Sequence, residues 1–162
     1  MAYYNNKNNM SGKTGYYGGN KPYDKPYVKF PPEGYLNGYY DDQKKQILRK
    51  EYILSYAKDI KTKLELDGGY NKNKRSQIRK FYDYCIRIRQ KLDAKKDFAY
   101  VAADFANLDP MASMQKSRNV VSESFYDFIR MNVEAVQDER DFRAFVLHFQ
   151  AIIAYMKKDE GR

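Results

Sequence analysis

The stretch from residue 142 to residue 156 constrains the fold most, because apolar side chains surround nearly the whole of a helix there. One stripe, at spacings of three and four residues, comprises Phe142, Phe145, Val146, Phe149, Ile152, Ile153 and Met156. Smaller residues form a second stripe opposite. Such a helix needs neighbours on two sides, and it is too short to span a bilayer, which takes about 20 apolar residues. We therefore expect it in the middle of a soluble helical bundle, or covered partly by its own chain and partly by another.

Three further apolar stripes at helical spacing precede this one. They comprise Tyr52, Ile53, Tyr56, Ala57, Ile60 and Leu64, then Ile78, Phe81, Tyr82, Cys85, Ile88 and Leu92, and then Phe125, Phe128, Ile129, Asn132, Val133 and Val136. A less regular helical stretch covers residues 97–119, and no β pattern appears after residue 40. The sequence therefore predicts an all-α domain over residues 41–158, a single bundle or orthogonal array of about five helices.

Polar residues mark the expected ends of these helices. The first helix is expected to start near Asp41 or Asp42, because acids suit a helix N-terminus. It should end at the turn formed by residues 67–69, where two glycines follow an aspartate. Later helices are expected to be capped by Ser76, Ser122 and Asp138.

Residues 1–40 differ from the rest of the chain. They hold nine of the seventeen tyrosines, six of the nine glycines and four of the five prolines, whereas Val28 and Leu36 are their only Val, Ile or Leu. So little aliphatic area cannot offset the entropy of ordering, and we predict a disordered tail. Loose RNA contact through tyrosine stacking and lysine charge is one role for it, but a solvated extension is the favoured interpretation.

The formal net charge of +9 suggests a polyanionic partner, either nucleic acid or an acidic membrane surface. On charge alone, a surface kept soluble by lysine is the better interpretation. A single cysteine forms no internal disulfide, which fits a reducing compartment. The N-terminus lacks an apolar signal core, so we expect a cytoplasmic protein without membrane insertion.

No catalytic constellation is recognisable. His148 is the only histidine, and the sequence pairs it with no Ser, Cys or acid, so a structural role at a helix seam is favoured. Cys85 lies in the middle of an apolar stripe and is read as a small buried hydrophobe. One His and one Cys are too few for a structural zinc site. We therefore predict no enzyme, no metal and no cofactor.

Basic residues give the strongest lead to a binding function. Four of them share one side of the second predicted helix, two precede it, and two more extend the track. The eight candidates for RNA contact are Lys74, Arg75, Arg79, Lys80, Arg87, Lys91, Lys116 and Arg118. Contact to backbone phosphates is expected, because no clustered aromatic platform accompanies them on that side. A solvated charged face is the alternative, and it would be favoured if the sequence resembled no known family.

Two segments resemble a known family when they are taken together. They are Ser76-Gln77-Ile78-Arg79-Lys80-Phe81-Tyr82 and Phe149-Gln150-Ala151-Ile152-Ile153-Ala154-Tyr155-Met156-Lys157. Their order, separation and helical surroundings, over about residues 44–157, resemble the small subunit of type III-A CRISPR effector complexes. The resemblance implies a non-catalytic helical subunit of an antiviral ribonucleoprotein. Several copies would stack head to tail beside the guide RNA and its paired target RNA, in contact with the backbone and large subunits.

Two other classes of protein remain open. A helical protein-interaction adaptor would carry its basic charge incidentally and would show no salt-sensitive RNA binding. A DNA-binding regulator is less favoured, because no pair of short helices joined by a tight turn is apparent.

Overall fold

The computed structural model describes residues 26–159 and shows only helices and connecting loops in that range. The elements are a 3-10 helix η1 (Lys50–Tyr52), α1 (Ser55–Gly68), α2 (Arg75–Lys95), a 3-10 helix η2 (Phe98–Tyr100), α3 (Ala102–Ala106), α4 (Leu108–Ser117), α5 (Glu123–Ala135) and α6 (Glu139–Tyr155). An isolated antiparallel bridge between Tyr40 and Leu48 is the only β pairing within this range. The all-α prediction is confirmed, with five helices of ten residues or more and the short α3.

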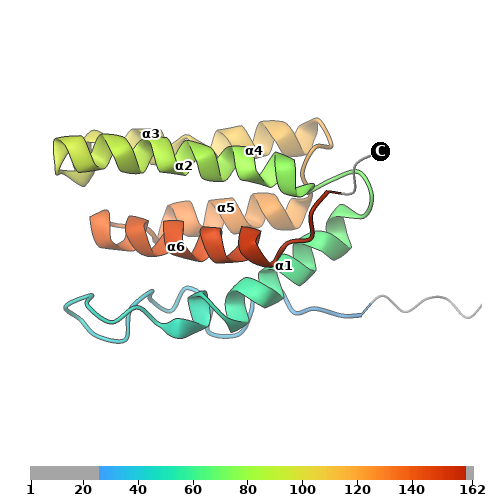
Figure 1. The fold of residues 1–162 in the computed structure, drawn as a ribbon, viewed down its shortest axis with the longest axis horizontal. Helices are drawn as coiled ribbons and strands as arrows, with labels where there is room; N and C mark the ends of the chain where they lie inside the picture. Colours follow the sequence, from blue (N-terminus) through green and yellow to red (C-terminus); the bar gives the residue numbers. More distant parts are fainter. Residues whose placement is uncertain (1–25, 160–162) are drawn as a thin grey trace, which may run out of the picture.

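The helices form a bundle with α6 in its interior. Helix α6 packs against α1 and α2, and α5 packs against α4 and α1. In Figure 1, α2, α4, α5 and α6 run along the long axis of the molecule, and α1 crosses them obliquely. The first apolar stripe of α6 is buried throughout, as the sequence predicts. In the second stripe only Ala144 and Ala151 are buried, and Leu147, Ala154 and Tyr155 are exposed.

Phenylalanine rings fill the space between these helices. Phe81 of α2 meets Phe125 of α5 edge to face, with ring centroids 4.9 Å apart. Phe128 of α5 meets Phe149 of α6 in the same way at 5.4 Å. Edge-to-face pairs of this kind add about 0.5–1.5 kcal/mol each beyond the area that they bury. The rings therefore join α2, α5 and α6 into one core.

Two of the predicted caps are confirmed. The hydroxyl of Ser122 accepts a hydrogen bond from the backbone N–H of Phe125 at 3.3 Å, and the carboxylate of Asp138 accepts one from the N–H of Asp141 at 3.0 Å. Both bonds satisfy N–H groups that have no partner within the helix. The caps explain why α5 and α6 start where they do.

The predicted cap of α2 is wrong, because the helix starts one residue before Ser76. Lys74 occupies the N-cap position, and a carboxylate from the other end of the chain binds the free N–H groups. The two oxygens of Asp159 accept from the backbone N–H of Arg75 at 2.8 Å and from that of Ser76 at 2.9 Å. A hydrogen bond with the Ser76 side chain, together with these two backbone bonds, lowers the pKa of Asp159. The contacts tie the C-terminal segment to the start of α2.

The predicted start of the first helix is also wrong. The carboxylate of Asp42 accepts the backbone N–H groups of Gln46 and Ile47, at 2.9 and 3.0 Å, and so closes a loop instead of capping a helix. A short acidic side chain can satisfy loop N–H groups as readily as helical ones. The chain reverses at Lys45, whose φ is +53°, and α1 begins only at Ser55.

The segment before η1 differs from the prediction of a disordered tail over residues 1–40. Residues 1–25 lie outside the described residues, so that part stays a prediction. Tyr35 and Tyr39, however, are buried in the core formed by α1, α5 and α6. The folded unit therefore begins before the predicted boundary at residue 41.

A buried network of hydrogen bonds fixes this segment. His148 donates from Nδ1 to the carbonyl oxygen of Tyr52 at 2.6 Å, so its Nε2 accepts from the hydroxyl of Tyr35 at 3.0 Å. The same hydroxyl accepts from Nδ2 of Asn132 at 2.8 Å, and the hydroxyl of Tyr39 donates to Oδ1 of Asn132 at 2.9 Å. Each polar group thus has a partner, which is what burial requires.

Ion pairs and hydrogen bonds also attach the same segment to the start of α6. Nζ of Lys45 lies 2.6 Å from a carboxylate oxygen of Asp138 and 3.0 Å from one of Asp141. Arg140 donates to the carbonyl oxygen of Lys45 at 2.8 Å, and the hydroxyl of Tyr40 donates to the carbonyl oxygen of Arg140 at 2.6 Å.

Within residues 26–159, no helix combines the length and apolar character needed to cross a membrane.

Candidate nucleic-acid interface

The outer side of α2 presents the central part of the predicted basic track. The inner side of this helix, which includes Phe81 and Cys85, is buried against the bundle. Lys80 and Arg87 lie on the other side and are exposed. Within the described residues neither forms an ion pair, so both charges are available to a ligand.

Three of the predicted residues have carboxylate neighbours. Nζ of Lys91 lies 2.7 Å from Asp104 of α3, and Nζ of Lys116 lies 3.0 Å from Glu123 of α5. Arg79 approaches Asp83, one turn along α2, only to 3.9 Å. Exposed pairs of this kind are worth about 0–1 kcal/mol. A phosphate can therefore compete for these side chains, but more weakly than for Lys80 or Arg87.

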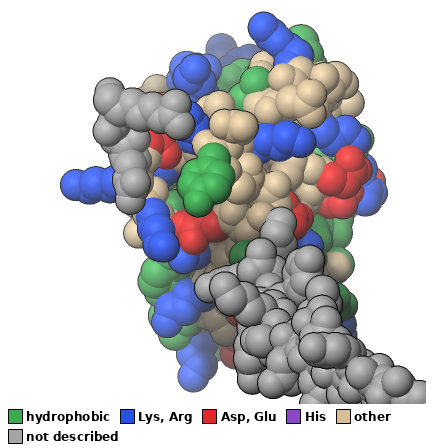
Figure 2. Space-filling view, turned by 90° about the vertical axis from the view of Figure 1, so that its right-hand side faces the viewer, with side chains coloured by type: hydrophobic (Ala, Val, Ile, Leu, Met, Phe, Trp, Pro, Cys, Tyr) green, Lys and Arg blue, Asp and Glu red, His purple; other side chains and the backbone are tan. Residues whose placement is uncertain are grey.

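The remaining candidates gather at one end of the bundle. Lys74 and Arg75 begin α2, and Arg118 follows α4. The backbone N–H of Asn73 donates to the carbonyl oxygen of Val120 at 3.1 Å, so the α1–α2 and α4–α5 loops lie against each other. Figure 2 looks onto this end, where Lys and Arg side chains lie around the visible surface. The structure thus divides the predicted track into this end and a row along α2.

One aromatic ring accompanies the row along α2. Tyr84 lies on the same side, and its ring centroid is 5.5 Å from Cζ of Arg87. The Tyr84 hydroxyl donates to the carbonyl oxygen of Asp104 at 3.0 Å, which fixes the half-buried ring beside α3. The spacing of three residues between Tyr84 and Arg87 was the available signal. A cation held against a ring face is positioned for contact with a phosphate or a base.

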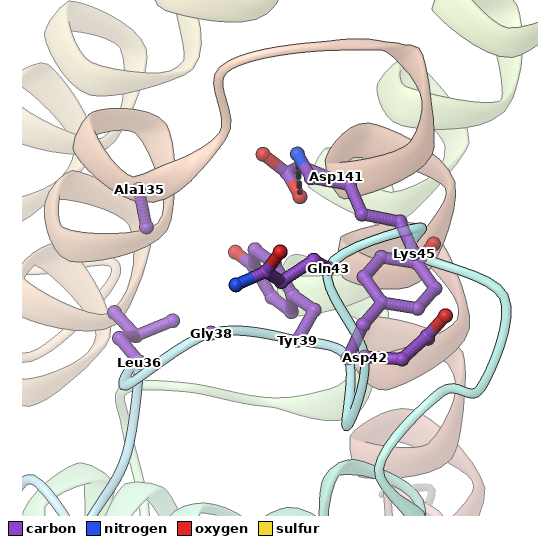
Figure 3. Close-up of a pocket in the computed structure, with 9 residues that line it drawn as sticks. Leu36, Gly38, Tyr39, Asp42, Gln43, Lys45, Ala135 and Asp141 are labelled. Atoms are coloured by element: carbon purple, nitrogen blue, oxygen red, sulfur yellow. Dashed lines mark hydrogen bonds and ion pairs between the residues drawn. The ribbon is translucent and has the colours of Figure 1, made fainter.

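A pocket of about 250 Å³ lies elsewhere, between the N-terminal segment and the loop that joins α5 to α6. Its lining includes Leu36, Tyr39, Gln43 and Ala135, and Figure 3 shows Lys45 extended toward Asp141 at its edge. The hydrogen bonds that Nζ of Lys45 donates to Asp138 and Asp141 raise the pKa of Lys45. The charged groups here are engaged with one another, so the arrangement stabilises the segment and offers no free base or nucleophile.

The two residues considered for catalysis are buried, as the sequence predicts. Burial lowers the pKa of His148 to about 4 and raises that of the Cys85 thiol to about 12. At neutral pH the histidine is therefore neutral and the thiol protonated, so neither can act on a ligand at the surface. Among residues 26–159, no group of three His, Cys, Asp or Glu side chains is arranged to hold a metal ion.

Comparison with protein families gives one match, to the family described as Csm2 Type III-A, over residues 48–162. This range covers most of the chain, including all six α-helices. The chain belongs to the Csm2 family of type III-A. As a Csm2 protein it is a subunit of a type III-A CRISPR effector, a complex of several subunits, as the resemblance in the sequence predicts. No curated protein and no solved structure matches the chain.

The Csm2 match and the structure differ in where the domain starts. The match begins at residue 48, whereas the buried network starts at Tyr35, thirteen residues earlier. All eight predicted contact residues lie inside the matched range. The Csm2 part of the chain therefore carries the basic surface, and the preceding segment completes the core.

Proposed function

We propose that this chain is a non-catalytic, RNA-binding structural subunit of the type III-A effector complex. It contacts the sugar-phosphate backbone of the guide RNA or of the paired target RNA through the exposed side of α2. The observation that carries this proposal is the pair Lys80 and Arg87, exposed and free of carboxylate partners within residues 26–159. They are seven residues apart, which is two helical turns, so they lie about 10 Å apart along one line.

The partners follow from the type of complex. We propose that several copies of the chain stack along the RNA, next to the backbone and large subunits, in the cytoplasm. The absence of a free base or nucleophile in the pocket, and the buried state of His148 and Cys85, support a role without catalysis. RNA cutting that is lost on substitution of a single acid or of His148 would contradict it.

RNA affinity across a salt series tests the contact surface. Counterion release gives a slope of log affinity against log salt of about −0.7 per phosphate contacted on a single strand. The double variant Lys80→Ala with Arg87→Ala should bind more weakly, with a slope shallower by about 1.4. Lys91→Ala should have a smaller effect, because Asp104 already holds that side chain.

A matched control removes the same charge elsewhere. Lys50 and Lys58 are exposed on the opposite side of the bundle, near η1 and α1. The double variant Lys50→Ala with Lys58→Ala should keep the wild-type slope. If both double variants behave like the wild type while remaining folded, the RNA lies elsewhere. If the wild type shows no salt-sensitive RNA binding at all, the chain is better described as a protein-interaction adaptor.

A further inference from the structure

The loop between α1 and α2 presents one tyrosine almost entirely to solvent. The side chain of Tyr70 is 96% exposed, more than that of any other large hydrophobic residue in the described range. It follows Gly69, whose φ of +54° turns the chain away from the end of α1. The ring therefore projects from the turn instead of packing on the bundle, and both of its faces are open.

Hydrogen bonds of one buried side chain make this loop rigid. Nδ2 of Asn73 donates to the carbonyl oxygen of Leu64 at 2.9 Å and to the hydroxyl of Ser122 at 2.6 Å. Its Oδ1 accepts from the backbone N–H of Ser122 at 2.8 Å. A Cβ at Gly68 would lie 2.9 Å from Cβ of Asn73, so the turn also fits closely. Tyr70 thus projects from a loop whose conformation is fixed before any ligand binds.

Cations follow the ring in the sequence and occur at the same end of the bundle. Two follow it within four residues, a third begins α2, and two more lie on the α4–α5 side of the same end: Lys72, Lys74, Arg75, Lys116 and Arg118. The bond between Asn73 and Val120 holds the two loops together. This combination of an open aromatic ring and several cations is typical of surfaces that bind single-stranded nucleic acid.

The acids at this end neutralise only one of these five cations, Lys116. Asp67 pairs with Lys63 at 3.2 Å, and Glu123 pairs with Lys116 at 3.0 Å. Asp159 is bound by two backbone N–H groups at the start of α2. Lys72 and Lys74 form no ion pair within the described residues, so the loop that carries the ring also carries two cations available to a ligand.

We propose that Tyr70 is a stacking platform for an unpaired nucleobase, with the adjoining phosphates bound by Lys72 and Lys74. This inference rests on the proposed RNA-binding function and adds the chemical form of the ligand. Within a duplex, neighbouring base pairs cover the faces of each base, so only an unstacked or terminal base can lie on the ring. The end of the bundle therefore recognises single-stranded RNA, while the row along α2 binds backbone of either form.

The experiment measures affinity of the full chain for two RNAs of equal length, one single-stranded and one a duplex. Base stacking on an aromatic side chain is worth a factor of about ten to a hundred. Tyr70→Ala should therefore weaken single-strand binding by about that factor and change duplex binding by less than about twofold. Tyr70→Phe keeps the ring and should restore wild-type affinity. The fluorescence of a base analogue placed in the single strand should be quenched on binding to the wild type and to Tyr70→Phe. Tyr70→Ala should lose this quenching.

Tyr100 supplies the matched control. It is 62% exposed and lies beside a lysine too, with Nζ of Lys95 5.9 Å from its ring centroid, but it follows the other end of α2. Tyr100→Ala should leave both affinities unchanged. Unaltered single-strand binding by Tyr70→Ala, with the Lys80 and Arg87 dependence intact, would overturn the stacking inference and leave the proposed function standing.

Two further outcomes would also overturn the inference. If Tyr70→Ala binds RNA normally but no longer assembles with the other subunits, the ring is a protein contact. If the wild type binds no RNA, both the stacking platform and the proposed function fail.

Discussion

Replacing Tyr35 by Phe tests whether the segment before η1 belongs to the core. The substitution keeps the buried ring and removes only the hydroxyl. Nε2 of His148 then loses its donor, and one N–H of Asn132 loses its acceptor. Each buried group left without a partner costs about 1–3 kcal/mol. We therefore expect the free energy of unfolding to fall by roughly 2–6 kcal/mol.

Urea unfolding followed by circular dichroism at the helical band measures this loss. With a slope of about 1–3 kcal/mol per molar urea, the midpoint should fall by about 1 M or more, with the slope unchanged. Tyr40→Phe is the matched control, because its hydroxyl donates to the carbonyl oxygen of Arg140 at an exposed site, where water can replace it. Equal midpoints for Tyr35→Phe, Tyr40→Phe and the wild type would refute the buried network.

Two other predictions concern the same region. Deletion of residues 1–40 removes Tyr35 and Tyr39 from the core, so thermal melting should occur at a clearly lower temperature than after deletion of residues 1–25; equal melting would contradict their burial. The pKa of His148 is lowered from 6.5 to about 4 by burial, so between these values the unfolded chain binds a proton that the folded chain does not. Stability should therefore rise with pH from about 4 to 6.5, by about 3 kcal/mol, and level off above. Because the chain has one histidine, its NMR resonance reports this directly, and titration near 6.5 would show an exposed imidazole.

The helices could be predicted because their signals are local. The spacing of Phe142, Phe145 and Phe149 is enough to identify α6, and Ser122 and Asp138 lie directly before the helices that they cap. Exposure of Lys80 and Arg87 follows from helical phase in the same way. None of these predictions depends on knowing which segments of the chain meet.

The rest of the structure depends on contacts between distant residues. Tyr35 and Tyr39 have too few aliphatic neighbours to predict burial, and their partners Asn132 and His148 lie about a hundred residues away. Asp42 has the composition of a helix cap but bonds to a loop. The pairing of Lys91 with Asp104 and the joining of two loops by Asn73 likewise require the assembled bundle. A local pattern carries no information about such partners.

The buried network also ties the evolution of one segment to that of two helices. Asn132 and His148 are tolerated in the core only because hydroxyl groups from residues 35 and 39 complete their hydrogen bonds. A relative without these tyrosines would leave Nε2 of His148, and Oδ1 and one N–H of Asn132, without partners in the core, which selection should remove. We therefore expect positions 35, 39, 132 and 148 to change as a set, with apolar residues at 132 and 148 wherever the tyrosines are missing. The segment would then be inherited or lost together with its binding site in the core.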